Sequence, residues 1–148
     1  MGKVRKEQLG RIFVYGTLLE GMPNHDWFCG DVLTIEPAVT TGRLYHLPYG
    51  FPAMFDSPDG QVFGEVMTFP NIDEKLKQLD YLEGYRTQRH SHYIRISKPV
   101  LILSKRKTTM AWVYVYPEER LEEIKRVGEI VSGGCWREYI FPRNNVIV

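Results

Sequence analysis

The sequence predicts an α+β fold, in which a mixed, mostly antiparallel sheet or small barrel of about six strands packs against two or three helices. Two observations predict it. Short apolar segments of strand length follow one another with turn signals between them, and segments with the helical spacing of apolar residues interrupt the series. The 148 residues, 43% of them hydrophobic and 25% charged, suit one domain over residues 1–148 with a single core.

Five apolar segments account for most of the predicted strands. The turn sequence Ser-Pro-Asp-Gly at 57–60 indicates that the segments before and after it pair as a hairpin, with residues 48–52 in a loop. In the last segment, aromatic and aliphatic side chains alternate, as they do on the two faces of a strand. The segments are residues 11–15, 39–47, 62–69, 93–103 and 108–116.

The helices are predicted from apolar stripes and end signals. Residues 71–83 are the clearest case, because Asn71 is a suitable N-cap, acidic residues follow in the first turn, and Gly84 comes directly after the end. Residues 118–131 are expected to form a second helix, and a short third one is expected after Asn24. The apolar stripes are Ile72, Leu76, Leu79 and Leu82 in the first helix and Leu121, Ile124, Val127 and Val131 in the second.

Charge and cysteine content narrow the function classes. Nineteen basic against eighteen acidic side chains give a net charge of +1, which does not favour a nucleic-acid or membrane partner. No apolar run approaches the roughly 20 residues of a spanning helix, and the first residues lack the apolar stretch of a secretory signal. Cys29 and Cys135 fit no metal, redox or disulfide spacing, so we expect reduced thiols in a cytoplasmic protein.

The common catalytic motifs are absent from the sequence, including the phosphate-binding glycine loops and the Gly-x-Ser-x-Gly elbow. His90 and His92 lack a second pair of metal ligands nearby, so we interpret them as a solvated pair. The basic turn at 105–107 is better explained as protection of a sheet edge than as a phosphate site. Oligonucleotide binding by this turn and the basic stretch 86–95 is a lower-ranked alternative.

Two segments are harder to explain as structure alone. The strand at 11–15 passes directly into Gly16, where glycine permits a sharp bend and successive N–H groups can converge on an anion or a developing oxyanion. An ordinary turn at the end of a strand explains these residues equally well. Glu83 follows Leu82 at the negative end of a helix dipole, and both desolvation and the dipole are expected to raise its pKa. The alternative for Glu83 is a solvated glutamate in the last turn, which the residue pattern by itself favours.

In these two segments the sequence resembles the gamma-glutamylcyclotransferase-like family. Tyr15-Gly16-Thr17-Leu18 is similar to the substrate-binding loop of that family, and Leu-Asp-Tyr-Leu-Glu-Gly-Tyr at 79–85 is similar to the segment that carries its catalytic glutamate. The run Gly-Met-Pro-Asn-His at 21–25 resembles the gamma-glutamylamine cyclotransferase branch most closely. The basic stretch 86–92 departs from the branch in length and charge. Further matches follow in the family's order at 42–45, 51–53, 93–95 and 111–114.

The resemblance implies an enzyme that acts on a small-molecule gamma-glutamyl-amine without a metal, a nucleotide cofactor or a covalent nucleophile. The alpha-amine of the substrate attacks its own gamma-carbonyl and releases 5-oxoproline and a free amine. The resemblance makes Glu83 the catalytic residue that transfers the proton. Tyr15 and Tyr93 would serve as pocket walls or hydroxyl donors. Substrate binding would fall to five further residues, of which the first four form the loop: Tyr15, Gly16, Thr17, Leu18 and Tyr93.

A non-catalytic module that binds a carboxylate metabolite is the alternative function. The same loop would then hold its ligand without chemistry. Neither the identity of the leaving amine nor the oligomeric state follows from the sequence. In the last part of the chain, Trp136 and Tyr139 are expected to close the core rather than to cover the pocket.

Overall fold

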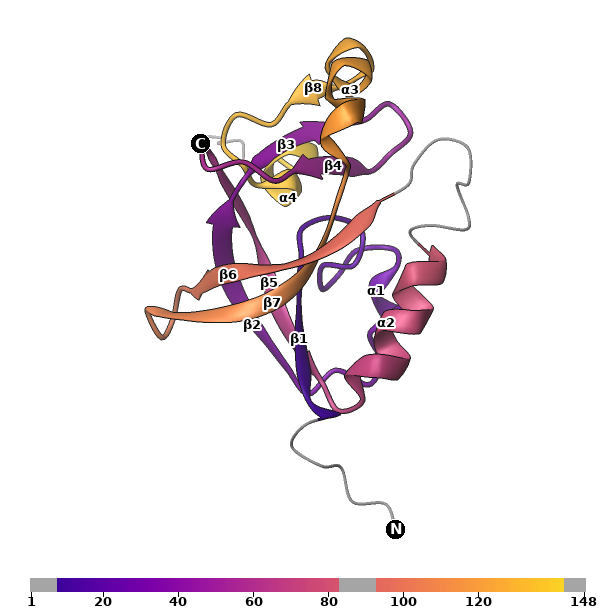
Figure 1. The fold of residues 1–148 in the computed structure, drawn as a ribbon, viewed down its shortest axis with the longest axis vertical. Helices are drawn as coiled ribbons and strands as arrows, with labels where there is room; N and C mark the ends of the chain where they lie inside the picture. The colour runs from indigo at the N-terminus through magenta and orange to yellow at the C-terminus, as the bar shows by residue number, and fades with distance from the viewer. Residues whose placement is uncertain (1–7, 83–92, 143–148) are drawn as a thin grey trace, which may run out of the picture.

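The computed structural model describes residues 8–82 and 93–142, whose strands form two sheets (Figure 1). Five strands close into a barrel in the order β1-β5-β2-β6-β7, and three shorter ones form a sheet in the order β4-β3-β8. All neighbours pair antiparallel except β1 and β7, so the prediction of an α+β fold with a mixed, mostly antiparallel barrel is confirmed. The barrel strands are β1 Gly10–Val14, β2 Thr34–Thr41, β5 Gln61–Phe69, β6 Ile94–Ile102 and β7 Lys107–Val115; the other sheet contains β3 Arg43–His46, β4 Pro52–Phe55 and β8 Glu129–Ile130.

The helices lie in two groups. The first pair, α1 (His25–Phe28) and α2 (Ile72–Asp80), lies beside the barrel near β1, and the later helices lie with the second sheet (Figure 1). The predicted stripe of α2 is confirmed, because Ile72, Leu76, Leu79 and Leu82 are all buried in the main core. The later helices are the single 3-10 turn η3 Glu118–Arg120, α3 Leu121–Val127 and α4 Trp136–Ile140.

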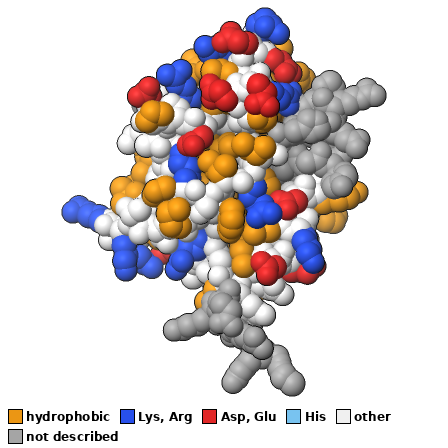
Figure 2. Space-filling model, viewed as in Figure 1, with side chains coloured by type: hydrophobic (Ala, Val, Ile, Leu, Met, Phe, Trp, Pro, Cys, Tyr) orange, Lys and Arg blue, Asp and Glu red, His pale blue; other side chains and the backbone are white. Residues whose placement is uncertain are grey.

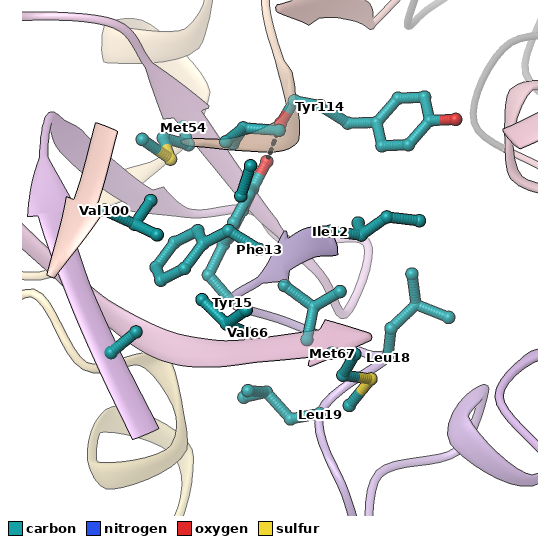
Figure 3. Close-up of a cluster of buried hydrophobic side chains, with 14 of the residues drawn as sticks. Ile12, Phe13, Tyr15, Leu18, Leu19, Met54, Val66, Met67, Val100 and Tyr114 are labelled. Carbon is teal, nitrogen blue, oxygen red and sulfur yellow. Dashed lines mark hydrogen bonds between the residues drawn. The ribbon is translucent and has the colours of Figure 1, made fainter. Parts of the chain in front are cut away.

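Strands β1 and β5 bury side chains on both faces of the sheet. Phe13 of β1 faces Val66 of β5 across the ladder, and both are buried among the cluster of side chains drawn in Figure 3. Their neighbours Ile12 and Met67 form the next register pair and are also buried. Such β-branched and aromatic pairs are the usual source of stability in an antiparallel sheet.

The segment predicted as one strand at 39–47 is two strands in different sheets. The chain breaks at Gly42, which has φ +156° and is packed so tightly that a Cβ would lie 2.8 Å from Cε of Met54 and 3.0 Å from the carbonyl oxygen of Phe55. The residues after the break pair with β4, whose first residue, Pro52, was expected in a loop. The hairpin partner of β2 is β5, as the turn sequence at 57–60 predicts.

The helix predicted at 118–131 is shorter than expected. It ends at Val127, which is exposed, and Ile124 is the buried member of its stripe. Gly128 then passes so close to β3 that a Cβ would lie 2.9 Å from the carbonyl oxygen of His46. The following residues pair with β3 as β8, because Ile130 lies opposite Tyr45.

The basic turn between β6 and β7 and the core role of Trp136 and Tyr139 are as predicted, whereas the helix α4 was not predicted. The turn carries Lys105, Arg106 and Lys107, all exposed, at the tip where basic side chains gather at the left of Figure 2. Trp136 is buried in the main core, and its indole Nε1 donates a 3.0 Å hydrogen bond to Nδ1 of His46. Tyr139 packs partly buried against the same core.

Candidate active site

The chain turns sharply after β1, at the loop that the sequence singles out. Leu19 N donates a 3.0 Å hydrogen bond to the carbonyl oxygen of Gly16, which closes the turn. A Cβ on Gly16 would lie 2.7 Å from Cγ of Pro52 at the start of β4. Glycine is therefore required here by the close approach of another segment.

Two residues further along the chain hold this loop in shape. Asn24 donates to Thr17 twice, from its backbone N to the carbonyl oxygen and from Nδ2 to Oγ1, both at 2.9 Å. The Nδ1 atom of His25 lies 3.0 Å from the carbonyl oxygen of Leu18. The sequence indicates a helix start at Asn24 and a family resemblance at 21–25, and neither indicates these bonds to the loop. Asn24 also precedes α1, as predicted, but its side chain bonds Thr17 and does not cap the helix.

In this loop the backbone carbonyl oxygens are used in hydrogen bonds within the protein, whereas backbone N–H groups remain available to bind a ligand. The carbonyl oxygens of Gly16, Thr17 and Leu18 all accept hydrogen bonds. Among the residues that the structure describes, the backbone N–H groups of these same three residues take part in no hydrogen bond. Since Gly16 and Leu18 are buried, where N–H groups are nearly always paired, the loop is suited to bind an anionic oxygen of a ligand.

Tyr15 fixes the loop to β7, the strand that pairs with β1 to close the barrel. Its side chain is 7% exposed, and its hydroxyl donates a 2.6 Å hydrogen bond to the carbonyl oxygen of Tyr114 in β7 (Figure 3). The hydroxyl proton is thus used within the protein. Of the two roles expected for Tyr15, this geometry favours a wall over a donor to a ligand.

The structure brings Tyr93 to the same place. Its hydroxyl donates a 3.1 Å hydrogen bond to the carbonyl oxygen of Pro52, the residue that packs against Gly16. Its ring meets the ring of Tyr116 edge-on, with centroids 4.5 Å apart. Tyr93, Pro52 and Gly16, which are distant in sequence, therefore form one continuous group.

Glu83 lies outside the described residues, as do His90 and His92. The residue before it, Leu82, is buried in the main core. Asp80, the last residue of α2, accepts a 2.6 Å hydrogen bond at Oδ1 from the hydroxyl of Tyr114. Because the carbonyl of Tyr114 accepts from Tyr15, one residue of β7 bonds both the loop and the end of α2.

The thiol of Cys29 is not suited to act as a nucleophile. Both Cys29 and Cys135 are free thiols, and Cys29 is fully buried. Burial raises the pKa of the Cys29 thiol to about 11, because the thiolate would lose its hydration. Cys29 is therefore protonated and unreactive near neutral pH.

Over residues 8–82 and 93–142, no three side chains of the His, Cys, Asp or Glu type are placed to hold a metal ion together. In the same part of the chain, no helix has the length and apolar character needed to cross a membrane.

Comparison with known families identifies the family of this chain. The model of the family described as "Gamma-glutamyl cyclotransferase, AIG2-like" matches residues 12–138. The chain belongs to this family. The match includes the loop after β1, Tyr93 and the segment that contains Glu83.

Individual members of the gamma-glutamyl cyclotransferase, AIG2-like family are moderately similar to this chain. The "Putative gamma-glutamylcyclotransferase" of Methanocaldococcus jannaschii is 31% identical over 130 residues, which are 86% of this chain and 96% of that protein. The "Gamma-L-glutamyl-butirosin B gamma-glutamyl cyclotransferase" of Niallia circulans is 30% identical over 71% of this chain and 65% of its own length.

A solved structure supports the fold of this family member. YkqA from Bacillus subtilis superimposes with a TM-score of 0.64 at 22% identity over 93% of this chain. The chain spans 44% of the length of YkqA. At this identity the likeness shows the barrel fold alone.

Proposed function

We propose that this protein is a gamma-glutamylamine cyclotransferase, in which the alpha-amine of the substrate attacks its own gamma-carbonyl. The observation that carries the proposal lies in the loop Tyr15-Gly16-Thr17-Leu18. Within the described part of the chain, the backbone N–H groups of Gly16, Thr17 and Leu18 are available as donors, while the carbonyls of the same three residues accept hydrogen bonds. Family membership supports the reaction class. The run at 21–25 supports the amine branch, because Asn24 and His25 within it hold the loop.

The loop suits both anionic oxygens of the reaction. A gamma-glutamyl group carries an alpha-carboxylate, and its gamma-carbonyl oxygen becomes negative when the amine attacks. Backbone N–H groups that are already fixed stabilise such charge without reorganisation, which is the main source of rate enhancement in acyl transfer. Gly16 and Leu18 are buried, so their dipoles act in a low dielectric.

Proton transfer is assigned to Glu83. The alpha-amine arrives protonated, and a carboxylate must accept its proton before the nitrogen can form the new bond to the gamma-carbon. The attacking nitrogen loses a second proton once the new bond has formed, and the same carboxyl passes both protons to the leaving nitrogen as the original amide bond breaks, so the products are 5-oxoproline and a protonated amine. Atoms and charge balance without a co-reactant. Because the new ring has five members, correct folding of the substrate supplies much of the rate.

The substrate class is a gamma-glutamyl group linked to an amine. The Niallia circulans relative is named as a gamma-glutamyl cyclotransferase of gamma-L-glutamyl-butirosin B. For the present chain we infer the same general form, with an unspecified amine. The free thiols of Cys29 and Cys135 support a cytoplasmic location.

A panel of substrates tests the proposal. Purified protein is incubated with gamma-glutamyl-lysine isopeptide, gamma-glutamyl dipeptides and gamma-glutamyl alkylamines, and 5-oxoproline is measured. We expect product from at least one class, and a loss of roughly 10²–10⁴ in rate in Glu83→Gln. The matched control is Glu74→Gln, which changes an exposed glutamate of α2 and is expected to keep full activity.

Two outcomes would count against the enzyme. An unchanged rate in Glu83→Gln would remove Glu83 from the mechanism. Absence of 5-oxoproline from every compound, together with saturable binding of a gamma-glutamyl compound, would favour the non-catalytic carboxylate-binding module.

A further inference from the structure

Glu65 of β5 is a buried carboxylate at the base of the loop after β1. The residue is 8% exposed, and of the acidic residues that the structure describes it alone is buried. In the ladder between β1 and β5 it lies opposite Val14, the residue before the loop begins at Tyr15. A buried charge is costly unless it is paired and hydrogen-bonded, so the partners of this carboxylate are informative.

The partners of Glu65 meet at the other end of the loop, at Glu20. Oε1 of Glu65 accepts a 2.9 Å hydrogen bond from the backbone N–H of Glu20. Oε2 lies 3.5 Å from Nη1 of Arg137 in α4, and Nη2 of the same guanidinium donates a hydrogen bond to the carbonyl oxygen of Glu20. Both backbone groups of Glu20 are therefore held by one ion pair, and the loop begins and ends beside Glu65.

This ion pair joins segments that are far apart in the sequence. Glu20 is 45 positions from Glu65 and 117 positions from Arg137. Arg137 belongs to the short helix α4, so the last part of the chain reaches the loop. Leu19, the residue before Glu20, closes the turn onto the carbonyl oxygen of Gly16. The position of Glu20 therefore fixes the end of the turn that directs the three available N–H groups.

The charges of the pair are important because the loop is suited to bind an anionic oxygen. An uncompensated carboxylate at the end of the loop would repel such a ligand, and the repulsion is strong where water is excluded. Arg137, whose side chain is 40% exposed, supplies the opposite charge. The pair therefore gives the N–H of Glu20 a charged acceptor, which forms a stronger hydrogen bond than a neutral one, without net negative charge beside the loop.

We propose that Glu65 and Arg137 are positioning residues for the cyclisation. The carboxylate of Glu65 fixes the end of the loop after β1. The guanidinium of Arg137 fixes the carbonyl of Glu20 and neutralises the carboxylate, so that the loop can receive an anionic oxygen of the substrate. The inference rests on the proposed function, and both side chains act through the backbone of the loop. Displacement of the binding groups by about 1 Å can cost roughly 10²-fold in rate.

The hydrogen bond to Glu20 is tested by two substitutions of Glu65. Glu65→Ala removes the acceptor, whereas Glu65→Gln keeps an acceptor oxygen in nearly the same position. Both are assayed well below their melting temperatures, with the gamma-glutamyl compound that the wild type converts fastest. We expect kcat/KM to fall at least about tenfold in Glu65→Ala and no more than about threefold in Glu65→Gln.

Asp56→Ala is the matched control for a loss of stability. Asp56 pairs at 2.6 Å with the buried Lys98, whose Nζ also donates to two oxygens of Thr41. Removal of this carboxylate leaves a buried charge without its ionic partner but changes no bond of the loop after β1. We therefore expect Asp56→Ala to have a lower melting temperature and wild-type kcat/KM.

The neutralising role of Arg137 is tested by a double variant. Arg137→Gln leaves the buried carboxylate of Glu65 without its cation, so we expect kcat/KM to fall at least about tenfold. Addition of Glu65→Gln removes that charge, so the double variant should be at least about threefold more active than Arg137→Gln alone. Arg137→Lys retains the positive charge and should lose less activity than Arg137→Gln.

The outcomes distinguish this inference from the proposed function. If the wild type forms 5-oxoproline and Glu65→Ala keeps its kcat/KM, the positioning role is wrong and the function stands. If Glu65→Ala and Asp56→Ala lose activity equally, the pair serves stability alone and the inference is equally wrong. A double variant no more active than Arg137→Gln would overturn the neutralising role. If the wild type forms no product from any compound, the proposed function fails and the inference fails with it.

Discussion

The hydroxyl of Tyr15 donates a 2.6 Å hydrogen bond to the carbonyl oxygen of Tyr114, which joins the loop after β1 to β7, the neighbouring strand that closes the barrel. The two residues are 99 positions apart in the sequence. Tyr15 precedes the three N–H groups that we assign to oxyanion or carboxylate binding. Their direction therefore depends on a bond that no local pattern in the sequence specifies.

Tyr15→Phe tests this anchor. The ring remains in the core, but the buried carbonyl of Tyr114 loses an acceptor bond, so we expect a loss of roughly 1–2 kcal/mol in the free energy of unfolding. The freed loop should also raise KM for the gamma-glutamyl substrate several-fold. Urea unfolding and steady-state kinetics measure the two effects. Tyr139→Phe is the control, because its hydroxyl bonds the exposed Glu129 and should affect neither quantity. Equal KM values in both variants would contradict the anchor.

Gly16→Ala tests the close approach of β4 to the loop. The added Cβ would lie 2.7 Å from Pro52, so either the loop or β4 must shift, and overpacking of this kind costs about 1–3 kcal/mol. We expect a lower melting temperature and a strong loss of turnover. Gly133→Ala is the matched control, since no atom lies within 4 Å of its added Cβ and activity should persist. Full activity in Gly16→Ala would show that the loop tolerates displacement.

Local patterns predicted the parts of the fold that depend on local contacts. The stripe of α2 follows from the 3.6-residue period, and its residues are buried as expected. Strands β4 and β8 were missed because they are short and exist through pairing with β3. Lys75 lies on the same helix and is buried, since its Nζ donates to the carbonyl oxygen of Phe28, 47 positions away. No periodicity indicates such a partner.

In the candidate site too, local sequence patterns predict some features, while others depend on tertiary contacts. A glycine directly after a strand predicts a turn, and the turn is present at Gly16. Pro52 and Tyr93 reach this turn through the barrel and the second sheet, so their contact with it depends on the tertiary fold. The role of Glu83 stays a prediction.

Asn24→Ala tests whether the side chain of Asn24 holds the loop after β1 in shape. The variant removes the 2.9 Å bond from Nδ2 to Thr17 Oγ1 and keeps the backbone bond to the carbonyl oxygen. We expect KM to rise by a few-fold and stability to fall by about 1 kcal/mol. Thr17→Ala removes the other end of the same bond and should match Asn24→Ala, because the proposed binding uses backbone groups. A loss in Thr17→Ala as large as that of Glu83→Gln would mean that the hydroxyl acts on the substrate directly.

The buried thiol of Cys29 predicts a dependence of stability on alkaline pH. Its pKa is raised by burial from 9.0 to about 11, so the folded state keeps the proton after the unfolded state has lost it. Stability therefore falls as pH rises from about 9 towards 11, and the thiol contributes nothing to this slope below pH 8. In urea unfolding, the wild type should lose on the order of 1–2 kcal/mol more than Cys29→Ala between pH 8 and pH 10.5, since one pKa unit corresponds to about 1.4 kcal/mol. Tyrosine and lysine titrations are common to both proteins and cancel in the difference. Parallel curves for the two proteins over this range would show that the thiol is hydrated in the folded state.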